Sequence, residues 1–274
     1  MIWTSESKIS LAKSAKNFID AMAAPPSDTR TVKKVIGESF KIPENSSEMQ
    51  LLLYLQADNF ERLLAQINLS SIEYEAKQTY TTQVRQLSTI VLHPVIHGRY
   101  DNARTNIIAP NYHALTYLND ALKIEYQVED AFLDEAEDLA KRLQTVLDEI
   151  STSDLPLDIK SILFSQISQL IFLLRNIRCV GPDRVKENAA STIVTIQGIA
   201  TKTDSKHHAG SLKSAAIVIL AILAGLDQGS HNAVGFLKNL KEGVEVIERW
   251  RGQSVPQIEY KKPKDLDGEN AVNV

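Results

Sequence analysis

The stretch from Leu155 to Leu226 most constrains the fold, because its apolar residues predict three consecutive helices. The expected ranges are 156–178, 182–200 and 211–225. In the first of these, apolar residues recur at three- and four-residue steps over a wide arc, which predicts contact with at least two neighbouring elements. The residues of this arc are Ile159, Ile162, Leu163, Ile167, Leu170, Ile171, Leu173, Leu174 and Ile177.

The third of these helices contains a run, Ala215 to Ala224, that is apolar on every side. A helix of this kind lies inside a protein core or inside a membrane. Ten residues span about 15 Å, which is about half of the hydrocarbon thickness of a bilayer. We therefore expect a buried core helix. The alternative is an apolar hairpin, residues 193–224, that inserts into a membrane when triggered.

The remainder of the chain also shows helical periodicity. Helices are expected over residues 5–23, 28–40, 46–67, 70–92, 112–126, 128–150 and 230–250, with Ser47 and Gln50 forming a capping box. The predicted fold is all-α, a multi-helix bundle of about nine to ten helices. An irregular linker at 93–111 separates an N-terminal helical unit (1–110) from a C-terminal helical bundle (111–252), and a disordered tail is expected over 253–274.

Composition and charge limit the classes of function. The net charge is −4, and no basic stripe with interleaved aromatic residues is present, so nucleic acid is not an expected partner. Cys179 is the one cysteine, which excludes an internal disulfide and fits a reducing compartment. The first twenty residues lack a continuous apolar segment, so we expect a cytoplasmic protein. No Walker or G-x-G-x-x-G motif indicates a cofactor, and none is predicted.

Two groups of polar residues are candidate sites. His93, His97 and Asp101 stand four residues apart, and on a helix this spacing would place three metal-ligating side chains on one face. The structural alternative is that these histidines are hydrogen-bonded within an irregular linker.

A second group, Asp130, Asp134 and Asp138, has the same spacing at an acidic helix start and could bind a basic partner or a cation. The simpler interpretation is that these carboxylates stabilise the helix dipole and pair with Lys141 and Arg142. No catalytic residue is assigned.

A segment of the chain resembles a group of bacterial helical proteins. They share the pattern L-P-x-x-x-K, then L-x-x-Q-I, then L-R before a helix opened by glycine, and the resemblance covers residues 127–197. The matching residues are Leu155, Pro156, Lys160, Leu163, Gln166, Ile167, Leu174, Arg175 and Gly181. The resemblance implies a bacterial or mobile-element origin and carries no assigned activity.

Three functions remain open from the sequence. The favoured one is a non-enzymatic helical interaction protein, a subunit or accessory of a bacterial multi-protein system such as phage defence, with a protein partner or a second copy of itself. The second is an effector that contacts a membrane through residues 211–226. The third is a metal-dependent hydrolase that uses His93, His97 and Asp101.

Overall fold

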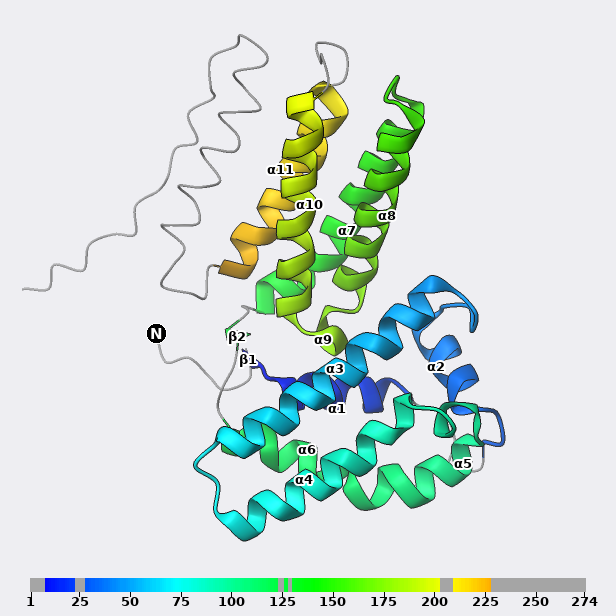
Figure 1. Ribbon diagram of the computed structural model, residues 1–274, viewed down its shortest axis with the longest axis vertical. Coiled ribbons are helices and arrows are strands. Elements are labelled where there is room, and N and C mark those ends of the chain that lie inside the picture. Colours follow the sequence, from blue (N-terminus) through cyan, green and yellow to red (C-terminus); the bar gives the residue numbers. More distant parts are fainter. Residues whose placement is uncertain (1–7, 23–27, 123–125, 128–129, 203–208, 228–274) are drawn as a thin grey trace, which may run out of the picture.

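The computed structural model describes the chain apart from residues 1–7, 23–27, 123–125, 128–129, 203–208 and 228–274. Within the described residues, the structure has nine helices of nine or more residues, which confirms the all-α prediction. In Figure 1 the N-terminal helices lie beneath an upright bundle formed by the C-terminal helices. The predicted helix 230–250 and the predicted tail lie outside the described residues.

The N-terminal half is built around α3 (Ser47–Leu69). Its long helices are α1 (Leu11–Ala21), α3, α4 (Tyr74–Ser88) and α6 (Ala109–Leu122). Each packs against two others, in the cyclic order α1–α3–α4–α6, while α2 (Val32–Phe40) covers one end. The apolar stripe of α3 faces this core, with Phe60, Leu63 and Ile67 fully buried. At α2, Phe40 stacks on Phe18 of α1 with ring centroids 5.6 Å apart.

The stretch predicted as an irregular linker is more helical than expected. Short 3₁₀ turns at Thr89–Val91 and Val95–His97 lead into α5 (Tyr100–Ala103), a π-helical turn (Arg104–Ile108) and then α6 without a break. Pro110 is the second residue of α6, directly after the π-helical turn. Helix α6, which the sequence prediction assigned to the C-terminal unit, packs against α1 and α4.

The C-terminal half is a second ring of four helices. It consists of α7 (Asp130–Thr152), α8 (Leu157–Arg175), α10 (Pro182–Lys202) and α11 (Ala209–Asp227). Each helix packs against its two neighbours, in the cyclic order α7–α8–α10–α11. The single turn α9 (Ile177–Val180) lies at the foot of this bundle and also contacts α1 and α3. The two halves therefore meet around α9, as Figure 1 shows.

Several helix starts differ from the predicted ones by a few residues, and those of α1 and α3 have a clear local cause. Residues Lys8–Ile9 form strand β1, which pairs antiparallel with β2 (Tyr126–Gln127), so α1 begins at Leu11 and not near residue 5. Ser10 caps α1, because its hydroxyl accepts a hydrogen bond from the Lys13 amide at 3.0 Å. Ser46, one residue before the predicted capping residue, caps α3 by accepting from the Met49 amide at 3.2 Å.

Candidate functional site

The junction between the halves is held by side-chain amides. Gln56 and Asn59, both fully buried on α3, donate to the carbonyls of Cys179 and Val180 at 3.0 and 3.3 Å. Asn17 of α1 donates to the carbonyl of Arg178 at 2.8 Å. These carbonyls need outside donors because the chain turns at Gly181, whose φ of 89° ends α9.

Two reciprocal ion pairs join α3 to the start of α10. Arg62 of α3 lies 2.9 Å from Asp183, and Arg184 of α10 contacts Asp58 of α3. Each helix contributes one cation and one carboxylate, and the side chains are partly buried. The two ion pairs therefore place opposite charges of α3 and α10 beside each other at the junction.

Cys179 lies inside this junction and is not a candidate nucleophile. Burial raises the pKa of its thiol to about 12, an effect that the nearby Arg178 only partly opposes. Since the thiolate is the reactive form of cysteine, a group with this pKa is inert near neutral pH. Cys179 therefore has a structural role at the α9 junction.

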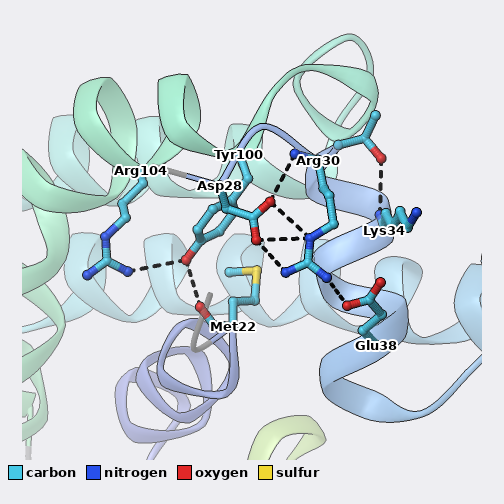
Figure 2. A network of polar contacts seen from close by, with 8 residues as sticks. Met22, Asp28, Arg30, Lys34, Glu38, Tyr100 and Arg104 are labelled. Atoms are coloured by element: carbon cyan, nitrogen blue, oxygen red, sulfur yellow. Dashed lines mark hydrogen bonds and ion pairs between the residues drawn. The ribbon is translucent and has the colours of Figure 1, made fainter. Parts of the chain in front are cut away.

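A second polar network pins the segment before α2 to α5, and Figure 2 shows it from close by. The Arg30 guanidinium donates to both carboxylate oxygens of Asp28 through Nε at 2.9 Å, and it also contacts Glu38. Tyr100, only 1% exposed, donates its hydroxyl proton to the Met22 carbonyl at 2.6 Å. The guanidinium beside Asp28 lowers the pKa of that carboxyl from 3.8 to about 2.

The structure brings together two of the three predicted metal ligands. His93 and His97 are exposed, with ring centroids 5.0 Å apart, but they do not share a continuous helix with Asp101. The Asp101 carboxylate pairs with Arg99 at 2.5 Å, which lowers its pKa. Among the described residues, no group of three or more His, Cys, Asp or Glu side chains could hold a metal ion.

The acidic face at the start of α7 is described only in part. Asp130 begins α7, and Asp138 is exposed and pairs with Lys141 at 3.0 Å. The side chains of Asp130 and Asp134 lie outside the described residues. The observed pair agrees with the simpler interpretation of carboxylates satisfied along their own helix.

Charge is missing from long stretches of three helices of the C-terminal bundle. No Asp, Glu, Lys or Arg occurs at 161–174 in α8, 188–201 in α10 or 214–226 in α11. At 1.5 Å per residue, each stretch is about 20 Å long. The absence of charge would be unremarkable if these helices were buried all round, but each has an outward side.

The outward side of α8 and α10 forms one uncharged surface. The Gln166 amide of α8 donates to the Thr195 hydroxyl of α10 at 3.1 Å, so these residues lie beside each other at the seam. Ile162 is one turn from Gln166 and 48% exposed, and Val194 is next to Thr195 and 67% exposed. With the exposed Ser191, these residues define what we call the α8–α10 face.

Sequence reasoning missed this surface. Periodicity placed Ile162 in the buried arc of the first central helix, yet nearly half of its side chain is accessible. The signal that could have found the surface is the lack of charge at positions such as Ser165, Ser191 and Gly198, which are exposed. A solvent-facing helix side ordinarily carries charged residues.

The predicted core helix is buried on one side only. Ala215, Ala216, Ile219, Ile222 and Leu223 of α11 are buried against the bundle. Ile217 on the opposite side is 52% exposed, and Ala221 is exposed as well. Among the described residues, α8 is long and apolar enough to cross a membrane by length and composition, and 39% of its apolar window is buried.

Comparison with known proteins gives no relative from which a site could be transferred. No family model, no curated protein and no solved structure matches the chain.

Proposed function

We propose that the chain is a non-enzymatic helical interaction protein that binds a protein partner, or a second copy of itself, through the α8–α10 face. The observation that carries the proposal is the exposure of Ile162 and Val194 within a surface free of charge. The cores of protein–protein interfaces are depleted in charged residues, because desolvating a charge costs free energy that a neutral side chain does not. The small side chains on this face, such as Ser191 and Gly198, let a partner backbone approach closely.

We propose a subunit or accessory role in a bacterial multi-protein system; the resemblance of residues 127–197 implies the bacterial origin and no activity. Phage defence is the context that we propose for that system. The N-terminal half, with its own closed ring of helices, acts in this proposal as a rigid body locked to the bundle at α9.

A charge introduced on the α8–α10 face tests the proposal. Val194→Glu places a carboxylate at the centre of the face and is expected to weaken partner binding or self-association at least tenfold, while the fold is kept because Val194 is largely exposed. Leu69→Glu is the matched control, since Leu69 is 88% exposed at the end of α3 in the other half. Native mass spectrometry and light scattering measure self-association, and affinity capture followed by titration measures a partner.

The proposal fails if the wild-type chain binds neither itself nor another protein, or if both variants bind as the wild type does.

A membrane-active role is the second candidate, favoured by the adjacent uncharged stretches of α10 and α11. Leakage of dye from liposomes over a range of pH and lipid compositions tests it, and no leakage under any of these conditions would end that candidate.

A further inference from the structure

The outward side of α11 is a second uncharged surface, separate from the α8–α10 face. Between Lys213 and Asp227 it carries no charged residue, and Ile217 and Ala221 are exposed. Val218 and Leu220 beside them are half-buried. We call Ile217, Val218, Leu220 and Ala221 the α11 face. A row of apolar side chains on the outside of a helix is stabilised when another apolar stripe covers it.

The chain itself supplies a stripe of the required kind directly after α11. Residues 230–250 lie outside the described residues, and their sequence predicts an amphipathic helix. Its apolar positions share one side of a helical wheel, whereas Lys238, Lys241, Glu242 and Glu245 fall on the other. The apolar positions are Phe236, Leu237, Leu240, Val244 and Ile247.

Length and connectivity match this stripe to the α11 face. Helix α11 has 19 residues and ends at Asp227, so Gln228 and Gly229 would form a short connection of the type that joins antiparallel helices. Nineteen residues span about 28 Å and residues 230–250 about 31 Å. If residues 230–250 fold back from this connection as an antiparallel helix, Leu240 would lie opposite Ile217 and Phe236 opposite Ala221.

We propose that residues 230–250 dock antiparallel on the α11 face as a fifth helix of the C-terminal bundle. Tethering favours this occupant over a second copy, because a short linker gives an effective concentration in the millimolar range. The docked segment covers the α11 face and leaves the α8–α10 face as the open uncharged surface of the bundle. The inference does not depend on the proposed function, because it concerns a different surface.

Disulfide trapping in the full chain tests the docking. In a Cys179→Ser background, the pair Ile217→Cys and Leu240→Cys is expected to form an intramolecular disulfide under mild oxidation, since these positions face each other. The control pair is Val194→Cys and Leu240→Cys, in which the first cysteine lies on the exposed side of α10 and not on α11. Mass spectrometry of the oxidised monomer and non-reducing electrophoresis measure the yield.

The expected result is an intramolecular link in most molecules of the first pair and at least tenfold less in the control. Equal yields in the two pairs, no link, or a covalent dimer in place of a linked monomer would each overturn the proposal, and the dimer would identify a second copy as the occupant. Helix content by circular dichroism checks first that the variants are folded.

A second measurement needs no cysteine. Leu240→Glu should undock the segment and raise the fluorescence of a dye that binds exposed apolar surface severalfold. Lys241→Glu, on the charged side of the predicted helix, is the matched control and should leave it unchanged. No difference between the two variants would contradict the docking.

Val194→Glu, which tests the proposed function, should not change the yield of the Ile217–Leu240 disulfide, so the two proposals can fail independently.

Discussion

The carboxylate of Asp28 is held in its ionised form by the guanidinium of Arg30 beside it. Sequence alone offered no sign of this pair, since residues 28 and 30 lie before α2 in a stretch with several polar residues. The tertiary structure creates it by hydrogen-bonding the chain there to α5, with the Tyr100 amide donating to the Arg30 carbonyl at 2.8 Å.

Acid should weaken the fold through Asp28. Its pKa is about 2 in the folded state against an ordinary 3.8, so its contribution to stability is present above pH 4 and is lost as the pH falls toward 2. Asp28→Asn is expected to lower the melting temperature at pH 7 and to match the wild type at pH 2. Thermal unfolding at both pH values measures this, with Glu61→Gln, an exposed carboxylate of α3, as the control. A deficit that is equally large at pH 2 would contradict the assignment.

Cys179 should resist thiol reagents until the protein unfolds. With a pKa of about 12, only about one thiol in ten thousand is ionised at pH 8, and the side chain is buried as well. We expect labelling by a thiol-specific reagent to be at least a hundredfold slower in the native protein than in denaturant. Fast labelling of the native chain would show that the α9 junction opens readily.

At the scale of the element, periodicity located the helices and chemistry at their ends set the boundaries. In α1, for example, the buried residues Ala12, Ala15, Phe18 and Ile19 recur at three- and four-residue steps. The capping residue of α3 was predicted one residue late, because Ser46 and Ser47 are equally suitable capping residues in sequence. Only the backbone conformation decides which hydroxyl reaches an unpaired amide.

The two serines give a direct test of the cap. Ser46→Ala removes the acceptor for the Met49 amide and should lower the free energy of unfolding by about 1 kcal/mol. Ser47→Ala, at an exposed position of the first turn, should change it by less than about 0.5 kcal/mol. Urea denaturation of both variants measures the difference. A larger effect at Ser47 would restore the capping box predicted from the sequence.

At the scale of the whole molecule, two rings of four helices are joined at the α9 junction. This junction consists of buried amides and reciprocal ion pairs between residues more than a hundred positions apart in sequence. In the sequence, Gln56 and Asn59 interrupt the apolar stripe of α3, and each stands one turn from buried leucine residues of that helix. The two amides are buried because the foot of the C-terminal bundle covers them.

Removing a buried hydrogen bond of the α9 junction should lower the free energy of unfolding of the whole chain. Asn59→Leu leaves the carbonyl of Val180 without its side-chain donor, while Gln56 still donates to Cys179, and the expected cost is about 1–3 kcal/mol. Asn68→Leu, at an exposed position on the same helix, should cost less than about 0.5 kcal/mol. Urea unfolding followed by circular dichroism measures both. Equal stability of the two variants would mean that the junction contributes little to holding the halves together.

The sequence by itself determined the all-α class, the positions of the helices and most of the inward residues, because helical periodicity is a local property that side chains impose on the backbone. It could not decide which sides of a helix would be covered. Ile162 and Ile217 have the same apolar character as Ile167 and Ile219, yet the first two are exposed and the others buried. Coverage depends on how many neighbours pack around each helix, and only the tertiary structure decides that number. The uncharged sides of α8, α10 and α11 are exposed because too few neighbouring elements pack around these helices to cover them.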